Sequence, residues 1–308
     1  MMDKHAIVIV TYNRSALLRE CLEAVESQTL PFDRIVVVDN ASTDDTWQLL
    51  EKKRQDPRYV IRREKENIGG SGGFAHGVRE AYETGARWVT IIDDDAILTE
   101  NFLEKLDQAA EADGGRYLCY AGVPLTDGIR LGHRRQVTGG LIKKERPVPM
   151  EAYQEERFLC DIASFCGLMV HRDVIEKIGY PQEAFFIWYD DTEYCLRIRE
   201  ETEIVNINGA VIHHKVPPAK PTKSFVSWKD YYGIRNRLWM AKKHYGMATA
   251  LYIGAKKILR CLAECLRSLF RGNFGEVPKE LALYFRAMRD GFSGKLGISE
   301  RYYPGRMK

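Results

Sequence analysis

The chain has 308 residues, 45% of them hydrophobic and 29% charged, which is enough apolar material for one large domain or a domain with an appendage. Its seven cysteines are odd in number and contain no C-x-x-C pair, which argues against a disulfide framework and a structural zinc site and favours a reducing, cytosolic setting. No signal peptide precedes the first strand-like segment, and no uncharged apolar run approaches the ~20 residues of a membrane span. We therefore expect a chain that does not cross a bilayer.

The charge is distributed unevenly along the chain. Residues 215–308 hold 20 Lys and Arg against 6 Asp and Glu, a balance of +14, whereas the first 214 residues have a balance of −11. The clearest change of composition is the Pro/Lys-rich stretch KVPPAKPTKS at 215–224. A basic second part is compatible with nucleic acid or with an anionic membrane as partner.

The first part of the chain alternates predicted strands and helices. Short apolar runs rich in β-branched residues predict buried parallel strands, and two segments between them predict helices. The strands are AIVIVTY at 6–12, RIVVVDN at 34–40, YVIRRE at 59–64 and WVTIID at 88–93, with helices at 15–28 and about 73–85. This order predicts an α/β fold with a mainly parallel sheet.

Polar residues follow each of these strands: TYNR at 11–14, DNAST at 39–43, ENIGGSGG at 66–73 and DDD at 93–95. Because open α/β sheets bind ligands outside the carboxyl ends of their strands, we expect these clusters to meet at one crevice. Arg14 would neutralise phosphate, Asp39 would accept hydrogen bonds from a base or ribose, and the glycines of 69–73 would let a ligand approach the backbone. Alternatively, that Gly-rich stretch is only a tight turn between strand and helix.

Three adjacent acids, Asp93, Asp94 and Asp95, close the fourth strand. Adjacent carboxylates repel one another and lose solvation when partly buried, so a divalent cation is a natural partner. The alternative is an acidic turn that is merely solvated.

The strings VTYNR, VVVDNASTDDT, NIGGSGGFAHG, IIDDDA and FFIWYDDTEYCLR, in this order, resemble glycosyltransferase family 2 over roughly residues 5–240. The resemblance is strongest to bacterial galactofuranosyltransferases and related rhamnosyltransferases. It implies a GT-A nucleotide-diphospho-sugar transferase fold, with a mixed, mainly parallel Rossmann-like sheet flanked by helices, and inverting, metal-dependent transfer from a sugar nucleotide. We divide the chain into this domain at 1–245 and a basic helical C-terminal region at 246–308.

The resemblance also implies which residues bind metal and donor. Asp93 and Asp95 would hold Mn²⁺ or Mg²⁺, and a later histidine would complete the site, His214 rather than His213 in GAVIHHK. On their own, these histidines would be assigned to a surface turn. The predicted donor-binding residues are Thr11, Asn13, Arg14, Asp39, Asn67, Gly69, Gly70, Asp93, Asp94 and Arg235.

The general base would be the second acid of the YDD sequence, Asp191, with Asp190 binding the acceptor or orienting the loop. Both acids could instead only cap the following helix. Phe165, Cys166 and Trp188 are predicted to contact the acceptor, although core packing is an equal alternative for the first two. Arg235 lies in a predicted helix at 225–245 and would reach a pyrophosphate or an anionic lipid-linked acceptor.

Beyond residue 250 the sequence predicts two basic amphipathic helices, KKILRCLAECLRSLFR at 256–271 and VPKELALYFRAMRDGF at 277–292. Such helices would lie on an anionic membrane surface, or pack on each other or on a second copy of the chain in a homo-oligomer.

These observations favour a hexosyltransferase that moves galactofuranose from UDP-galactofuranose to a lipid-linked or growing bacterial cell-envelope glycan, in polysaccharide biosynthesis. We expect it in the cytoplasm, peripherally attached to the inner face of the plasma membrane. The alternative within the class is rhamnosyl transfer from dTDP-rhamnose. More remote alternatives are a non-catalytic sugar-nucleotide binder and a nucleic-acid-binding protein, the latter disfavoured because acids gather at the crevice.

Overall fold

The computed structural model describes residues 4–126, 128, 131–215, 227–275 and 277–306. Most of the Pro/Lys-rich stretch and the first two residues of the helix predicted at 225–245 lie outside these residues. The chain forms two compact units. The first comprises Met1–Val137, Glu145–Glu183 and Asp191–Pro217, and the second comprises Thr138–Lys144, Ala184–Asp190 and Pro218–Lys308. The helix around Arg235 is thereby grouped with the C-terminal helices, whereas the functional boundary at 245/246 stays a prediction.

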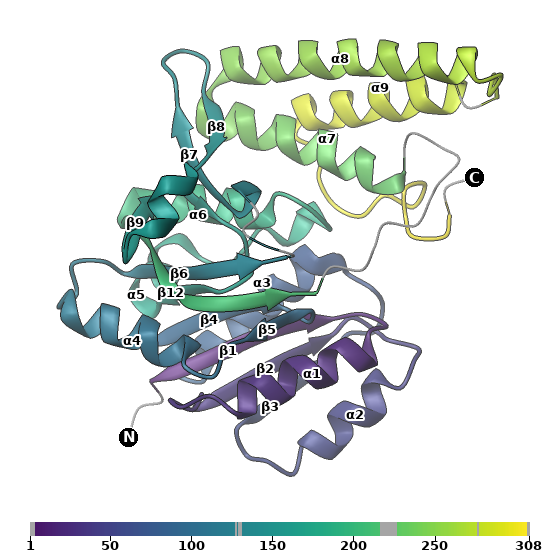
Figure 1. Cartoon of the computed structure of the whole chain (residues 1–308). Helices are drawn as coiled ribbons and strands as arrows, with labels where there is room; N and C mark the ends of the chain where they lie inside the picture. The colour runs from purple at the N-terminus through teal and green to yellow at the C-terminus, as the bar shows by residue number, and fades with distance from the viewer. Residues whose placement is uncertain (1–3, 127, 129–130, 216–226, 276, 307–308) are drawn as a thin grey trace. The chain divides into compact units, whose positions relative to one another are not determined.

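The first unit is built on a sheet that is parallel in its N-terminal part and mixed beyond it (Figure 1). The parallel strands lie in the order β3-β2-β1-β4 and are β1 (His5–Thr11), β2 (Arg34–Asp39), β3 (Tyr59–Arg63) and β4 (Trp88–Asp93). All four confirm predicted strands. The sheet continues with β11 (Leu168–His171), β6 (Cys119–Leu125), β12 (Ile204–His214), β5 (Ala96–Leu98) and β9 (Arg157–Cys160).

Both faces of the parallel strands are buried by helices. Along β1, Ile7 and Ile9 pack in a core that contains Leu18 and Leu22 of α1, whereas Val8 faces α3. This division follows from the period-two alternation of side chains along a strand. The flanking helices are α1 (Ser15–Glu26), α2 (Thr46–Lys53), α3 (Gly69–Glu83), α4 (Phe102–Ala112), α5 (Arg172–Ile178) and α6 (Asp190–Glu201).

Helix α3 begins at Gly69, four residues earlier than predicted, so the Gly-rich stretch is the first turn of a helix and not a loop. The glycines allow the helix to lie directly on β1. A Cβ atom at Gly73 would stand 2.5 Å from Val10 Cγ1, and one at Gly77 would stand 2.4 Å from Val8 Cγ1. Glycine lacks the atom that would clash, which explains why helix-forming positions carry a residue of poor helix propensity.

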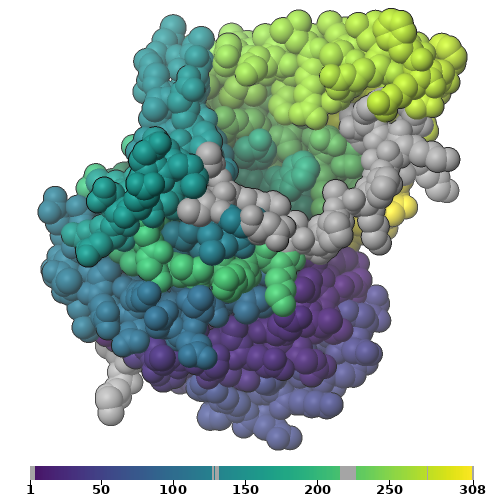
Figure 2. Space-filling model, viewed as in Figure 1, coloured from purple at the N-terminus to yellow at the C-terminus, as the bar shows by residue number. Residues whose placement is uncertain are grey.

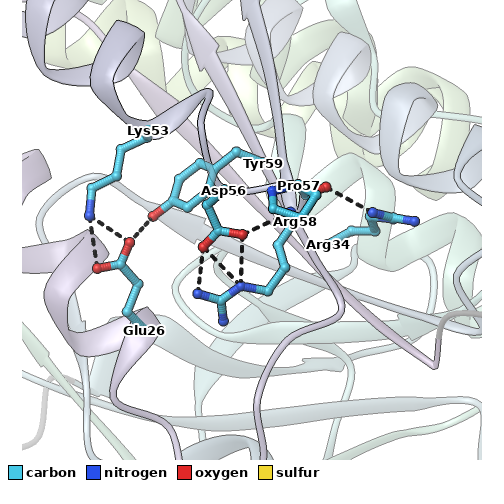
Figure 3. Close-up of polar contacts among 7 residues, drawn as sticks. All are labelled: Glu26, Arg34, Lys53, Asp56, Pro57, Arg58 and Tyr59. Carbon is cyan, nitrogen blue, oxygen red and sulfur yellow. Dashed lines mark hydrogen bonds and ion pairs between the residues drawn. The ribbon is translucent and has the colours of Figure 1, made fainter.

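A polar network fastens α1 and α2 to the start of β3 (Figure 3). Glu26, the last residue of α1, accepts hydrogen bonds from Lys53 Nζ at 2.6 and 2.8 Å and from the Tyr59 hydroxyl at 2.5 Å. In the turn before β3, Asp56 accepts from the Arg58 guanidinium at 2.7 to 3.1 Å. These contacts fix the edge of the sheet furthest from the acidic triplet.

A small sheet, in the order β10-β7-β8, joins β10 (Ile162–Ala163), β7 (Arg134–Thr138) and β8 (Lys144–Pro147). The seven cysteines are all buried free thiols, and burial raises the pKa of each one. They pack as small apolar side chains.

The second unit consists mainly of α7 (Trp228–Met240), a π-helical turn at Ala241–Tyr245, α8 (Met247–Phe270) and α9 (Val277–Ser293). Tyr231, Tyr232 and Leu238 of α7 pack with Leu283 and Tyr284 of α9 in a separate core. Helix α7 begins with a capping box that the sequence analysis did not predict. The side chains of Ser227 and Asp230 each bond the other residue's backbone N–H. The two C-terminal helices are thus confirmed.

Helix α8 exposes the apolar stripe that the sequence offered for packing. The apolar ridge consists of large apolar α8 side chains that are exposed by between 42% and 89% and follow the first turn of the helix: Leu251, Ile258, Leu259, Leu262, Leu266, Leu269 and Phe270. Its packed face is small and polar instead: Tyr284 Oη donates to Glu264 Oε2 at 2.7 Å, and Ser268 Oγ donates to Glu280 Oε1 at 2.8 Å. The two helices do pack on each other, through Cys261 and Cys265 of α8 and Leu283 and Tyr284 of α9. The larger apolar side chains of α8 are left out of this contact and lie along the surface of its unit (Figure 2). Among the described helices none is long and apolar enough to span a membrane.

Candidate active site

The three adjacent acids lie where β4 ends, as predicted. Asp93 is the last residue of β4, and Asp94 and Asp95 form the turn into β5. The end of β1 supplies their partners: Thr11 Oγ1 donates to Asp94 Oδ2 at 2.7 Å, and Arg14 NH1 donates to Asp94 Oδ1 at 3.0 Å and to Asp95 Oδ2 at 2.9 Å. Because β1 and β4 pair in parallel, their carboxyl ends lie side by side, as predicted for neighbouring parallel strands.

His214 joins this cluster because β12 pairs antiparallel with β5, which sets His214 opposite Ala96. Its Nε2 lies 3.0 Å from Asp95 Oδ1. His213, the neighbouring residue on the strand, points to the opposite face. A possible metal site is formed by Asp93, Asp95 and His214. Each offers one ligand atom, and these three atoms lie within 4.8 Å of one another, so the residues can hold a metal ion. Two carboxylates and an imidazole are a suitable donor set for Mn²⁺ or Mg²⁺.

The acids carry more negative charge than the protein alone neutralises. Burial and the charge of Asp95 raise the pKa of Asp93 to about 7, and burial, opposed by Arg14, raises the pKa of Asp94 to about 6. Burial would also raise the pKa of Asp95, but the hydrogen bond and charge of His214 outweigh it and lower that pKa. A bound cation would favour the ionised form of all three acids, because opposite charges stabilise each other.

Sequence reasoning missed His133, which borders the cluster. Its ring lies edge-on to that of His214, with 5.5 Å between centroids, and its Nδ1 is 2.8 Å from Ser164 Oγ. The adjacent Arg134 is fully buried and donates to Asn206 Oδ1 at 2.7 Å and to the carbonyl of Cys166 at 3.3 Å. Isolated in the sequence, His133 gave no signal, because only the turn into β7 brings it next to β12.

The other predicted donor residues occupy the loops after β1, β2 and β3. Asn13 adopts a left-handed backbone with φ of 54°, and its Oδ1 accepts from Thr43 N at 2.7 Å, which links the first two loops. Asp39 is fully buried and accepts from Ser42 N at 2.9 Å. Asn67 Oδ1 accepts from Gly69 N at 2.8 Å. These contacts shape the loops, and the donor contacts of Asn13, Asp39, Asn67, Gly69 and Gly70 remain predictions.

Asp191 is oriented by a chain of hydrogen bonds that the sequence did not reveal. Its Oδ1 accepts from both the backbone N–H and the hydroxyl of Thr192, at 2.5 and 3.0 Å, and Arg135 NH2 in turn donates to that hydroxyl at 2.7 Å. The negative charge of Asp191 contributes to raising the pKa of Asp93, so the two carboxylates are electrostatic neighbours. Asp190 is buried and begins α6, as the capping alternative also allowed.

Within the second unit, α7 fixes the segment Ala184–Asp190. Arg235 is 1% exposed and donates to the carbonyls of Gly297, Ala184 and Phe185 at 2.5 to 3.1 Å. The Asn236 amide nitrogen lies 3.0 Å from three carbonyls, that of Phe185 again and those of Ile187 and Trp188. The fold buries the guanidinium of Arg235 among backbone carbonyls, and its predicted donor contact stays a prediction.

The segment so held is strained. Phe186, Trp188 and Tyr189 have φ values of 67° to 70°, in the left-handed region that bulky side chains avoid. Trp188 is 44% exposed, and its ring lies where a Cβ at Gly233 would clash, 2.7 Å away. Surrounding contacts must over-determine this backbone, and the exposed Trp188 ring leaves its acceptor role as a prediction.

Phe165 and Cys166 are also predicted to contact the acceptor. Both are buried, and Phe165 packs edge-to-face against Phe74 at 4.9 Å and Tyr194 at 6.0 Å between ring centroids. Their side chains pack in the core, as the alternative allowed, and their contact with an acceptor stays a prediction.

The fold is similar to those of two solved proteins bound to a nucleotide or a nucleotide sugar. The structure of residues 1–349 of S. aureus TarS in complex with UDP-GlcNAc is similar with a TM-score of 0.58 and 17% identity, covering 92% of this chain and 81% of that one. That of GalNAc-T7 with UDP, GalNAc and Mn²⁺ gives a TM-score of 0.57 and 14% identity, covering 81% and 53%. Together with the β-strand order and the acids after β4, these likenesses define the fold as GT-A, as predicted.

Residues 6–179, more than half of the chain, match glycosyl transferase family 2. The chain therefore belongs to this family. It is 29% identical over 195 residues to galactofuranosyltransferase GlfT1 of Mycolicibacterium smegmatis, a match that covers 62% of this chain and 64% of that protein. The chain thus spans slightly less than two thirds of this relative's length.

Proposed function

We propose that the chain is an inverting, metal-dependent hexosyltransferase that transfers galactofuranose from UDP-galactofuranose to a lipid-linked or growing bacterial surface glycan. The observation that carries the proposal is the convergence of Asp93, Asp95 and His214 beside the end of β4 in a chain of this family. Residues from three separate strands or turns supply these ligand atoms, which distinguishes the cluster from a solvated acidic turn.

Asp93, Asp95 and His214 would hold Mn²⁺ or Mg²⁺. When bound, the ion would neutralise the charge that develops on the diphosphate leaving group as the glycosidic bond breaks. Arg14, which already bridges Asp94 and Asp95, adds a guanidinium that can donate to the same phosphates. Thr11 and Arg14 donate to the two oxygens of Asp94, so a contact of this carboxylate with ribose or sugar would be made beside these hydrogen bonds.

Asp191 would act as general base and take the proton from the acceptor hydroxyl that attacks the anomeric carbon. The hydroxyl and backbone N–H of Thr192 both donate to Oδ1 of Asp191. This leaves Oδ2 of the same carboxylate as the atom that can accept the proton. Because Arg135 fixes the Thr192 hydroxyl, the carboxylate would be oriented before the acceptor arrives.

The donor assignment rests on the GlfT1 similarity, and dTDP-rhamnose is the competing donor. Calorimetric titration with UDP and dTDP, each with Mn²⁺ and then with EDTA, separates the two. We expect UDP to bind with Mn²⁺ and binding to be lost with EDTA. Preference for dTDP would replace the sugar assignment by rhamnose, and binding of neither nucleotide would contradict the transferase proposal.

Two variants separate donor binding from chemistry. Asp95→Asn should lose metal-dependent UDP binding, because it removes a ligand charge. Asp191→Asn should keep UDP binding and lose transfer by about 10² to 10⁴-fold, the usual contribution of a general base. Transfer by Asp191→Asn at the wild-type rate would show that another group is the base.

We further propose that the chain attaches peripherally to an anionic membrane, on the cytoplasmic face, where a lipid-linked acceptor would lie. The support is the apolar ridge on α8 together with the basic residues Lys256, Arg260, Arg267 and Arg271 on the same helix. Exposed Leu and Phe side chains with flanking Lys and Arg suit the interface between headgroups and acyl chains. Self-association through the same ridge is the alternative arrangement, a homo-oligomer.

A further inference from the structure

Helices α7 and α9 and the segment that follows α9 line an open cavity of about 530 Å³ within the second unit. The following segment runs back along α7 (Figure 1). The cavity has no part in the reaction described above. Its charged lining residues are Arg235, Arg286, Arg289, Lys295 and Arg301 against Asp290 and Glu300. This composition gives a surplus of positive charge in a concave, largely polar site.

Only part of this charge is neutralised by the protein. Asp290 is already saturated, because it accepts from Arg289 at 2.7 Å and from the Tyr231 hydroxyl at 2.7 Å. Arg235 is bound to backbone carbonyls. In contrast, the side chains of Arg286, Lys295 and Arg301 have neither an ion pair nor a hydrogen bond within the described part of the chain. Three cations facing one cavity repel one another unless an anion enters.

The wall that carries two of these cations is held in place. Lys295 N donates to the carbonyl of Asp290 at 2.9 Å, Gly297 N donates to that of Ala184 at 2.9 Å, and Ser299 N donates to the Tyr232 hydroxyl at 3.0 Å. Tyr302 stacks on Tyr231 with 4.4 Å between ring centroids and 18° between planes. A fixed backbone therefore carries Lys295 and Arg301 along one side of the cavity, where both can reach the same anion.

We propose that this cavity binds a phosphate group, with Arg286, Lys295 and Arg301 as its ligands. Guanidinium groups pair with phosphate oxygens through two parallel hydrogen bonds, and a lysine adds a point charge. The volume admits a phosphorylated headgroup and not only an ion. The proposal does not depend on the transferase assignment, because none of its residues belongs to the acidic cluster.

The probe is inorganic pyrophosphate, titrated into the full chain by calorimetry in the presence of EDTA, which prevents metal-dependent binding at Asp93 and Asp95. We expect one binding site, weakened at least about tenfold by Arg301→Ala or Lys295→Ala, because a charge-assisted hydrogen bond contributes ~1.5–3 kcal/mol. Arg267→Ala is the matched control, since it removes the same charge from α8 outside the cavity. Arg14→Ala controls for binding at the acidic cluster.

Binding unchanged in both controls supports the proposal. Absence of binding in EDTA, or equal weakening by Arg267→Ala and Arg301→Ala, overturns it, because the latter would be diffuse attraction to a basic surface. Vesicles of phosphatidylcholine with phosphatidic acid, compared with phosphatidylglycerol at equal charge, then identify the source. If pyrophosphate displaces the chain from vesicles that contain phosphatidic acid, the site binds a lipid headgroup. If neither pyrophosphate nor Arg301→Ala changes vesicle binding, the site binds a soluble phosphate ester.

Discussion

Strand β1 and helix α8 are both rich in apolar side chains, yet they lie in opposite environments. All seven residues of β1 are buried, with helices on both faces of the strand. Helix α8 buries Glu264, Ser268 and two cysteines, and exposes its leucines. An apolar pattern therefore indicates a surface to be removed from water, but it does not identify what covers that surface. The contrast is thus between β1, whose apolar side chains are covered by helices of the same unit, and α8, whose leucines are exposed.

The largest effect is expected where the second unit fixes the strained segment before Asp191. Asn236→Ala removes the amide that serves three backbone carbonyls around Trp188. Buried carbonyls left without a donor cost ~1–3 kcal/mol, so we expect transfer to fall roughly 10- to 100-fold. UDP binding with Mn²⁺, which uses the first unit, should remain.

Parallel measurement of acceptor KM and kcat, with Asn236→Gln as the conservative comparison, separates positioning from general damage. A positioning role predicts that the acceptor parameters change while the UDP affinity does not. If UDP affinity falls equally, Asn236 acts only through the stability of the whole chain.

The next effect concerns the apolar ridge. Leu262→Ser combined with Leu266→Ser should reduce sedimentation with anionic liposomes about tenfold or more, because each buried CH₂ contributes ~0.8 kcal/mol at a membrane. The melting temperature should hardly change, since these side chains are already exposed. The control is Leu141→Ser, an 81% exposed leucine outside the ridge. Unaltered liposome binding by the double variant would exclude the ridge as the attachment surface.

A smaller effect is expected at the contact between α3 and β1. Gly77→Ala places a Cβ 2.4 Å from Val8 Cγ1, which should lower stability by roughly 1–3 kcal/mol. Gly70→Ala is the matched control on the same helix, because a Cβ there has no atom within 4 Å and alanine favours helix by up to about 1 kcal/mol. Chemical denaturation of both variants measures the difference. Equal stabilities would mean that α3 can shift away from β1 freely.

The smallest effect is the pH dependence of the metal-free protein. The pKa of Asp93 is raised to about 7 in the folded state from an ordinary value of 3.8, so its protonated form favours folding at low pH, and this stabilisation is lost as pH rises through 7. Relative to Asp93→Asn, the wild-type melting temperature in EDTA should fall by a few °C between pH 4.5 and 8. Parallel curves for the two proteins would refute the raised pKa.

The four parallel strands and helices α1 and α3 followed from the sequence because buried parallel strands are continuous apolar runs and their helices have one apolar face. The cluster of Asp93, Asp95 and His214 was predicted through the family resemblance. His133, Arg135 and Thr192 were not, since their positions depend on turns and on pairings between segments distant in the chain. The backbone partners of Arg235 were not predicted for a related reason: the sequence does not show whether the partner of an arginine is a ligand or a buried carbonyl.

The burial of all seven cysteines gives the chain a use in spectroscopy. Thiols with a raised pKa in cysteines that are at most 7% exposed react slowly with maleimide or nitroxide reagents. A cysteine introduced at an exposed position, such as Ile258→Cys on the ridge or Leu141→Cys away from it, would therefore be labelled selectively in the otherwise natural sequence. Oxygen or nickel accessibility of a spin label at these two positions would then report directly how deeply each enters a lipid bilayer.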